Sequence, residues 1–385
     1  MNLDERQAWI CLASVHALGE ETFGALLSTF GSAAGALAAA LDGRLESWIE
    51  KRRRLDGRPP VTAPVTAAIR AAADDPGSLL GTIAERGLWT VTPLDPNYPR
   101  RLRDLDPPPL VVNGKGDPQA LSRARAVSLV GTRRPTPAGR ALAAQIAARL
   151  VESDATVVSG LAFGIDGAGH SAALDHEGIT VGVIGGGHDH PGPTAHARLR
   201  DEVVAGGGAV ISEYHPTVSA RKGTFPRRNR IIAALGDATI VVEAPVRSGA
   251  LNTATHALAL DRPVFVAPGR IGDWSSAGVL ALLRESPVHV VAGLDELIED
   301  LGYLDAPGAE GETDVGSREQ ALRMLGTTER AVARRLIEGP AGLDGLVAAT
   351  GLAPAAASSA VTLLLMRGWV QSVGPAYMVA GVLAR

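Results

Sequence analysis

AVSLVGTRRPTPAGRALAAQIAARLVESDATVVSG, residues 126–160, is the stretch that decides the fold class of this chain. Residues 126–130 and 156–160 are short apolar runs typical of buried strands, and residues 138–152 between them have the apolar spacing of a helix. Similar apolar runs recur at 179–184, 208–213, 238–244, 263–269 and 288–291. A further candidate helix covers 250–260. Strands that are apolar throughout and alternate with helices predict an α/β fold with a Rossmann-like, doubly wound, mostly parallel sheet.

The N-terminal part of the chain, residues 1–85, reads as helical. Apolar spacing near 3.6 is found in 8–15, 21–31 and 63–73. Residues 17–32 place a glycine-containing turn between two short helical patterns. This arrangement is typical of an ordinary packing pair or of a helix-hairpin-helix that binds nucleic acid, and the pattern leaves both open. We therefore expect a small helical domain of the helix-hairpin-helix or SAM-like kind.

Three further segments complete the predicted organisation. Residues 86–304 form the Rossmann-like domain, and its proline-marked stretch 93–116 is expected to be extended rather than one continuous helix. Residues 305–320 are small, polar and acidic, as in a flexible linker. Residues 321–385 show three helical patterns and a hairpin, which predict a winged helix-turn-helix. Its candidate recognition helix carries one basic residue, Arg367, so we expect a protein-contact or packing module rather than a duplex reader.

Composition narrows the class of protein. The 385 residues carry a net charge of −4, so a nucleic-acid surface has to be a local basic patch rather than a uniformly basic body. The single cysteine, Cys11, has no partner for an internal disulfide and is expected to pack in an apolar helix. We find neither a signal peptide nor an apolar run of membrane-spanning length, so we expect a cytoplasmic protein that does not enter a membrane.

A cluster of cations lies in the segment that ends with FPRRNRIIAAL, residues 225–235. Five cations fall within ten residues and no carboxylate separates them: Arg221, Lys222, Arg227, Arg228 and Arg230. Arginine forks match phosphate oxygens, and a lysine ammonium adds a point charge. The cluster is therefore a candidate phosphate-binding loop, and a solvated or ion-paired loop is the alternative.

Small residues follow the predicted strands, where ligands bind in open parallel sheets. The loops contain Gly131–Arg134, Gly160 with Gly164, Gly185–Gly187, Ser212 with Glu213, and Arg247–Ala250. Glycine permits close approach of an anionic backbone, but it also permits tight turns in any α/β protein. Because glycine turns need no guanidinium groups, Arg133 and the cations at 221–230 favour an anion site.

Two groups of titratable residues are further candidates for chemistry. Asp166 and His170 are four residues apart and are expected to share a helix face, either as an acid–base pair or, preferably, as a helix cap and a structural hydrogen-bond partner. His188, Asp189, His190 and His196 lie close together in sequence. Their spacing matches no zinc signature, so we expect no metal site.

The chain resembles the DNA-processing protein A, or Smf, family. The resemblance runs in uninterrupted order through YPRRLRDLDPPPLVVNGKG, VSLVGTRRPTPAG, VVSGLAFGIDGAGHSAAL, GGGHD, ISEYHP, KGTFPRRNRII and VVEAPVRSGALNTATHAL, over about 97–270. It implies a core that binds single-stranded DNA in a basic pocket, forms a homodimer, and helps to load the RecA recombinase onto DNA coated by single-strand-binding protein. Natural transformation or general recombination is the implied role, without a catalytic residue, cofactor or metal.

The resemblance also implies roles for single residues. Arg133 would contact backbone phosphate, Lys222, Arg228 and Arg230 would add further phosphate contacts, and Asn229 would order the loop. Gly160, Gly164 and Asp166 would shape the adjacent wall. The complete predicted DNA-binding set is Arg133, Arg134, Gly160, Gly164, Arg221, Lys222, Arg227, Arg228, Asn229, Arg230, Ser248 and Gly249.

Three positions depart from the family pattern. Phe163 stands where an arginine is usual, which weakens a phosphate contact or replaces it with a base-stacking face. Gly192 stands where a tyrosine usually precedes proline. His16-Ala17 replaces the more usual Pro-Gly of the N-terminal turn, which puts DNA contact by that turn in doubt.

An enzymatic alternative is a nucleotide-binding hydrolase of the phosphoribohydrolase-like Rossmann group. In those proteins a Gly-Gly-x-Gly-Thr-x-x-Glu motif supplies the catalytic glutamate. In this chain Thr253 is followed at the same spacing by His256, so no carboxylate occupies that place. Dinucleotide-dependent redox chemistry is disfavoured as well, because the first strand ends in GTRRPTPAG rather than G-x-G-x-x-G.

Overall fold

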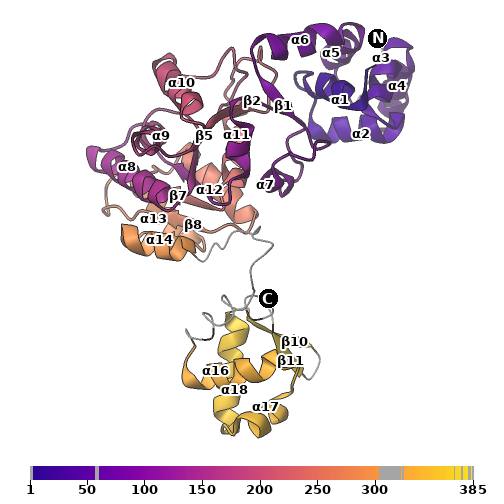
Figure 1. The fold of residues 1–385 in the computed structure, drawn as a ribbon. Coiled ribbons are helices and arrows are strands. Elements are labelled where there is room, and N and C mark those ends of the chain that lie inside the picture. The colour runs from indigo at the N-terminus through magenta and orange to yellow at the C-terminus, as the bar shows by residue number, and fades with distance from the viewer. Residues whose placement is uncertain are drawn as a thin grey trace. The chain divides into compact units, whose positions relative to one another are not determined.

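The computed structural model describes residues 3–56, 60–302, 322, 325–367, 369–373, 376–379 and 383. The chain forms two compact units, Met1–Pro307 and Gly308–Arg385 (Figure 1). The predicted linker, residues 305–320, lies outside the described residues. Within the described ranges, no single helix is both long and apolar enough to cross a membrane.

A nine-stranded sheet organises the first unit. Its strands are β1 Trp89–Val91, β2 Val112–Gly116, β3 Ala126–Val130, β4 Thr156–Ser159, β5 Thr180–Val183, β6 Ala209–Ser212, β7 Ala238–Val241, β8 Val264–Val266 and β9 His289–Val290. The strand order is β1-β2-β6-β5-β4-β3-β7-β8-β9. The strands from β3 to β9 pair in parallel, whereas β1 and β2 extend one edge in antiparallel. The predicted mostly parallel sheet is confirmed, and β1 and β2 are strands that the apolar pattern did not predict.

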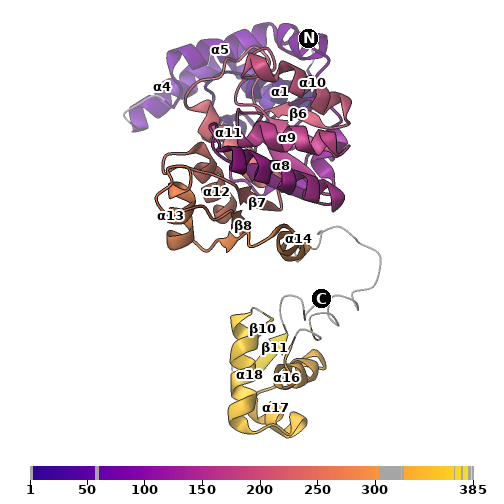
Figure 2. The ribbon, with the colours of Figure 1, turned by 90° about the vertical axis from the view of Figure 1, so that its left-hand side faces the viewer.

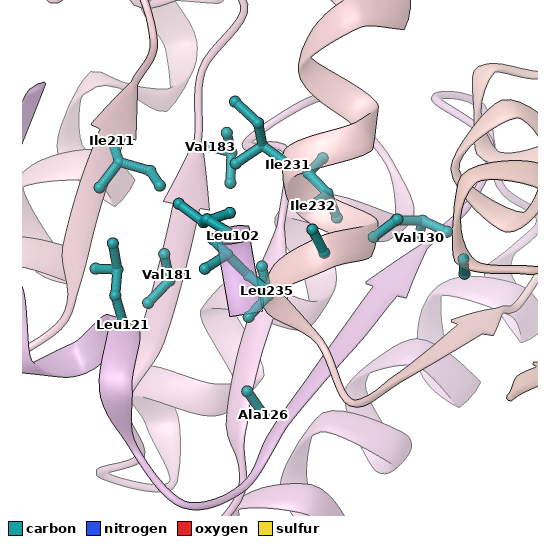
Figure 3. Close-up of a cluster of buried hydrophobic side chains, with 14 of the residues drawn as sticks. Leu102, Leu121, Ala126, Val130, Val181, Val183, Ile211, Ile231, Ile232 and Leu235 are labelled. Carbon is teal, nitrogen blue, oxygen red and sulfur yellow. The ribbon is translucent and has the colours of Figure 1, made fainter. Parts of the chain in front are cut away.

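Helices cover both faces of this sheet (Figure 2). One layer contains α8 Pro137–Glu152, α9 Ile165–Asp175, α10 Ala197–Ala205 and α14 Leu294–Gly302; the other contains α7 Arg100–Arg103, α11 Thr224–Leu235, α12 Gly249–Ala259 and α13 Ala277–Glu285. Two short 3₁₀ turns cover Pro118–Ser122 and Thr194–His196. Along β3, Ala126 and Val130 pack under α11, as Figure 3 shows, while Val127 and Leu129 pack under α8 and α9. Burial on both faces explains why these strands are apolar throughout.

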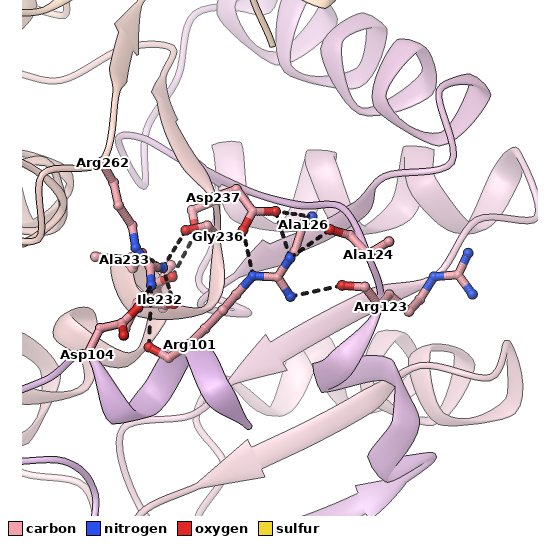
Figure 4. Close-up of polar contacts among 12 residues, drawn as sticks. Arg101, Asp104, Arg123, Ala124, Ala126, Ile232, Ala233, Gly236, Asp237 and Arg262 are labelled. Atoms are coloured by element: carbon pink, nitrogen blue, oxygen red, sulfur yellow. Dashed lines mark hydrogen bonds and ion pairs between the residues drawn. The ribbon is translucent and has the colours of Figure 1, made fainter. Parts of the chain in front are cut away.

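A polar network fixes the end of α11 against the strands (Figure 4). Asp237, which follows α11, accepts two hydrogen bonds from Arg101 at 2.6 and 2.7 Å and a third from the Ala126 amide at 2.9 Å. Arg262 donates to the carbonyls of Ala233, Ala234 and Gly236. These bonds satisfy carbonyls that a helix leaves unpaired at its C-terminus.

Six helices precede the sheet and enclose a core of their own. They are α1 Glu5–Ala13, α2 Glu20–Phe30, α3 Ala33–Leu41, α4 Arg44–Asp56, α5 Ala63–Asp74 and α6 Pro76–Glu85. Cys11 is fully buried in this core, as expected for a packing residue. The helices also contact the segment between β1 and β2: Trp9 Nε1 donates to the Leu110 carbonyl at 2.7 Å, and Arg6 pairs with Asp95 at 2.6 Å.

The second unit contains α16 Thr327–Ile337, α17 Leu343–Thr350, α18 Pro354–Met366 and the antiparallel strands β10 Val370–Val373 and β11 Ala376–Val379. Three helices followed by a hairpin confirm the predicted winged helix. The candidate recognition helix α18 carries no lysine or arginine, and its Leu363 and Leu365 are exposed. Arg367, directly after α18, lies over the Trp369 ring, with 5.4 Å between its guanidinium carbon and the ring centroid.

In the turn between α1 and α2, Ala17 adopts a backbone conformation that suits the more usual glycine better than alanine. Ala17 has a φ of 65°, in the left-handed region that favours glycine and costs other residues about 1–2 kcal/mol. Replacing Ala17 with glycine should therefore raise the free energy of unfolding by about 1 kcal/mol. Denaturant unfolding of the variant measures this change.

The matched control is Ala67→Gly, at an exposed position inside α5. The same substitution should there lower the free energy of unfolding by about 1 kcal/mol, because glycine disfavours helix interiors. A loss of stability in Ala17→Gly comparable to that of the control would contradict the strain at this turn.

Candidate functional site

A cavity of about 440 Å³ lies at the carboxyl ends of β3 and β7. On one side of β3 the sheet continues through β4, β5 and β6, and on the other side through β7, β8 and β9. The strand order therefore reverses between β3 and β7, and doubly wound sheets bind ligands at such a switch point. The lining residues are Val130, Gly131, Thr132, Arg133, Arg134, Ala162, Asp166, Phe225, Pro226, Arg228, Asn229, Ile232, Pro245, Arg247, Ser248, Gly249, Ala250, Asn252, Thr253 and Trp274. The fold thus brings the loops after β3 and β7 and the first turns of α11 and α12 around one space.

The electrostatics of this cavity favour an anion. Arg133, Arg134 and Arg247 line it and are exposed to solvent. The guanidinium of Arg133 lies over the Phe225 ring, 5.3 Å from its centroid, which holds this cation at the cavity wall. The N-termini of α11 and α12 also face the cavity through Pro226 and Gly249, and helix N-termini attract negative charge.

Arg228 lies at the bottom of the cavity and is 5% exposed. Its Nη1 donates to the carbonyls of Gly160, at 2.8 Å, and Val183. Burial lowers the pKa of Arg228 to about 10, and the nearby Asp166 carboxylate opposes that shift. The guanidinium is therefore still charged at neutral pH, but its hydrogen bonds go to the ends of β4 and β5.

Asp166, in the first turn of α9, accepts from the amides of Gly160 at 3.2 Å and Ala162 at 3.4 Å. Burial raises the pKa of Asp166, while Arg228 and these amides oppose the rise. His170 Nδ1 bonds the Thr180 hydroxyl at 2.7 Å, and burial lowers the pKa of His170 to about 3. The expected structural role of His170 as a hydrogen-bond partner agrees with its bond to Thr180, but the expected helix cap is wrong: α9 is capped by Gly164 without a side-chain bond, and Asp166 instead holds the loop before α9.

Asn229 and two glycines set the shape of the walls. The Asn229 amide donates to the Gly249 carbonyl at 3.1 Å and to Asn252 Oδ1 at 3.2 Å, which ties α11 to the start of α12. At Gly160 an added Cβ would lie 2.7 Å from Asp166 and 2.8 Å from Arg228. Gly164 has a φ of 85°, and an added Cβ there would lie 2.3 Å from the Thr132 carbonyl. Both glycines lie behind the cavity lining, where they permit close packing.

The cations at 221–230 are not one loop, contrary to the sequence-based expectation. α11 begins at Thr224, so Arg227, Arg228 and Arg230 belong to a helix. Arg227 and Arg230, three residues apart, share a helix face and both pair with Glu20 of α2 and with Glu213. Arg228 points in a different direction, beneath the strand ends.

The Arg227 side of α11 borders a second cavity of about 280 Å³ between the helical part and the sheet. Its lining includes residues 13–20, Glu213 and Arg227. Glu213 has a side chain 4% exposed, and its carboxylate is 2.5 Å from Arg230. The carboxylates of Glu20 and Glu213 neutralise the charges of Arg227 and Arg230. This cavity therefore has no surplus of positive charge. Arg221 and Lys222 are exposed just before α11, outside both linings.

The remaining candidates contact separate partners. His188 Nε2 bonds the Asn113 carbonyl at 3.1 Å, Asp189 pairs with Arg86, and His196 Nδ1 bonds the Leu161 carbonyl at 3.0 Å. In the described part of the chain, no three His, Cys, Asp or Glu residues are grouped to hold a metal. Phe163 is exposed and packs edge-on against His196 at 4.8 Å, outside the cavity lining. The exposed Gly192, with a φ of 109°, and His256 are not lining residues either.

The DNA-binding set predicted from the sequence leaves out several lining residues, among them Arg247, Asn252 and Trp274. Arg247 stands in the loop after β7, which the sequence analysis had identified as a strand end without including the arginine in the site. Trp274 follows β8 at the same edge of the sheet, on a loop that begins with Pro268-Gly269. The position of both loops at the carboxyl edge was the available signal.

Comparison with known proteins shows which family has this architecture. Residues 89–302 match the model of the DNA recombination-mediator protein A family, and residues 317–374 match the DprA winged helix domain. The chain is 39% identical over 314 residues to the putative DNA processing protein DprA of Mycobacterium tuberculosis, covering 78% of each chain. It is 35% identical to DNA processing protein DprA of Bacillus subtilis, over 58% of this chain and 74% of that protein.

Two solved structures share the fold. The DNA processing protein A of Streptococcus pneumoniae has a TM-score of 0.56 and 34% identity, covering 61% of this chain and 82% of that one. The protein from Helicobacter pylori, whose structure concerns a single-stranded DNA binding mode, has a TM-score of 0.51 and 29% identity, covering 56% of this chain and 96% of that one. With the family model spanning more than half of its length, this chain belongs to the DNA-processing protein A family.

Proposed function

We propose that this protein binds single-stranded DNA through the cavity at the β3–β7 switch point. The observation that carries the proposal is the convergence of Arg133, Arg134 and Arg247 with the N-termini of α11 and α12 on one open cavity. Guanidinium forks and helix N-termini both bind phosphate oxygens. Backbone contacts of this kind tolerate any base sequence, which suits a protein that acts on DNA strands in general.

The cations of the predicted site divide into three groups in this proposal. Arg133 and Arg134 bind phosphates inside the cavity, and Ser248 and Gly249 approach them from the start of α12. Arg221 and Lys222 are exposed one turn before α11, where they guide the strand toward the cavity. Arg228 and Asn229 hold the cavity together, and Arg227 and Arg230 hold α2 against α11.

The relatives support this function. The Helicobacter pylori relative binds single-stranded DNA according to its structural description, and it shares its fold with 56% of this chain. The family is one of recombination mediators. We therefore extend the proposal to a cytoplasmic homodimer that helps to load RecA onto DNA coated by single-strand-binding protein, in transformation or recombination. These partners rest on the family resemblance.

We also propose that the protein works by binding and not by catalysis. A phosphoribohydrolase needs a free glutamate beside the bound ribose, and His256 occupies the corresponding position of the motif. Asp166 lines the cavity, but two backbone amides and Arg228 already engage its carboxylate. Glu243 accepts from the amide and hydroxyl of Thr136 at the start of α8.

Removing two of the cavity arginines, Arg133 and Arg134, should abolish most of the affinity. If the wild type neutralises about four phosphates, its log affinity for oligothymidylate falls with log salt at a slope of roughly −3. In Arg133→Ala/Arg134→Ala the slope should flatten to roughly −1.5, and affinity at low salt should fall at least tenfold, to about the non-specific level. Fluorescence anisotropy across a salt series measures both quantities.

The matched control is Arg52→Ala/Arg198→Ala, which removes the same charge from exposed helix positions paired with Asp56 and Glu202. This variant should keep the wild-type slope. Arg228 is unsuitable for the test, because its removal would leave buried carbonyls without a donor and the buried Asp166 carboxylate without its nearby cation. Equal losses in the test and control variants would count against a phosphate site at the switch point.

Deleting residues 321–385 should leave the affinity for single-stranded DNA within about threefold of the wild type, because α18 offers no basic side chain to a phosphate backbone. The same anisotropy titration, with a duplex of the same length beside the single strand, gives the answer. A loss of affinity well beyond threefold, or a duplex preference that disappears with the deletion, would show that the winged helix binds DNA itself.

A further inference from the structure

Trp274 is an exposed aromatic residue at the edge of the cavity. It lines the cavity from the loop between β8 and α13, and 64% of its surface is accessible. A side chain of this size normally buries most of its surface, so its position on a ligand-binding edge needs an explanation.

The loop that carries Trp274 is braced rather than extended into solvent. Ser276 donates its amide to the Asp273 carbonyl at 3.2 Å, and the Gly278 amide donates to the Ala244 carbonyl, beyond β7, at 2.8 Å. Gly269 and Ser276 are so close that an added Cβ on Gly269 would lie 1.9 Å from the Ser276 hydroxyl. Because both flanks are fixed and Ser275 and Ser276 are buried, the indole is held at the cavity edge.

The surroundings of Trp274 indicate what it meets. Arg133 and Arg134 line the same cavity, and so does Arg247, which precedes the α12 N-terminus. The other lining aromatic, Phe225, is already covered by Arg133. Cations and an open indole on one cavity meet two requirements of a single strand, because phosphates need cations and unpaired bases stack on aromatic faces. A duplex presents no free base face to such a platform.

We propose that Trp274 stacks on a nucleobase of single-stranded DNA whose backbone phosphates occupy the adjoining arginine-lined cavity. The inference rests on the proposed function, and it adds the position where the base is recognised. Stacking is indifferent to which base is present, so this contact gives preference for single strands over duplex without sequence specificity.

The test compares an oligothymidylate with an abasic deoxyribose-phosphate oligomer of the same length. Trp274→Ala should weaken binding of the oligothymidylate about fivefold to a hundredfold, the range of one base–aromatic stack, and leave binding of the abasic oligomer unchanged. Trp274→Phe should retain part of the affinity. The oligothymidylate should quench tryptophan fluorescence of the wild type and quench it less in Trp274→Ala.

The matched control is Ile271→Ala, which removes a side chain that is 94% exposed from the same loop and should leave both affinities unchanged. Normal oligothymidylate binding by Trp274→Ala would overturn the stacking role while leaving the arginine site intact. Failure of the wild type to bind either oligomer would overturn the proposed function and this inference with it. Equal weakening of both oligomers by Trp274→Ala would also overturn stacking.

Discussion

The buried guanidinium of Arg228 is the interaction on which the site depends. It joins α11 to the carbonyls that follow β4 and end β5, next to the Asp166 carboxylate at the start of α9. A buried cation is tolerated only when its partners are in place, so this contact fixes the rotation of α11 about its own axis. That rotation turns Phe225 and Pro226 toward the cavity, and it brings Asn229 to the start of α12.

The same rotation of α11 determines which partners Arg227, Arg228 and Arg230 contact. Successive helix residues point about 100° apart, whereas residues three apart share a face. Arg227 and Arg230 therefore meet Glu20 and Glu213 on the side of the helical part, and Arg228 lies under the strand ends. A basic run that is compact in sequence is dispersed in space. The free positive charge of the cavity comes instead from Arg133, Arg134 and Arg247, on loops that belong to two strands.

The sheet was predictable because burial on both faces leaves strands without alternation, and each apolar run from 126–130 to 288–291 contains a parallel strand. The edge strands β1 and β2 escaped notice because prolines surround β2 and β1 is three residues long. That the loops after the parallel strands meet at one edge of the sheet was also predictable, because parallel strands place their carboxyl ends at the same edge. The ion pairs of Arg227 and Arg230 with Glu20 were not, because Glu20 lies some 200 residues away and only tertiary packing brings it close.

We propose that a DNA strand binds this fold at the β3–β7 switch point, against the face of α11 whose orientation Arg228 fixes. The most direct measurement is a crystal structure with a short oligothymidylate bound. We expect phosphates within hydrogen-bond distance of Arg133 and Arg134, and intact ion pairs from Arg227 and Arg230 to Glu20. A strand lying along Arg227 and Arg230 with these ion pairs broken, and an empty switch-point cavity, would contradict it.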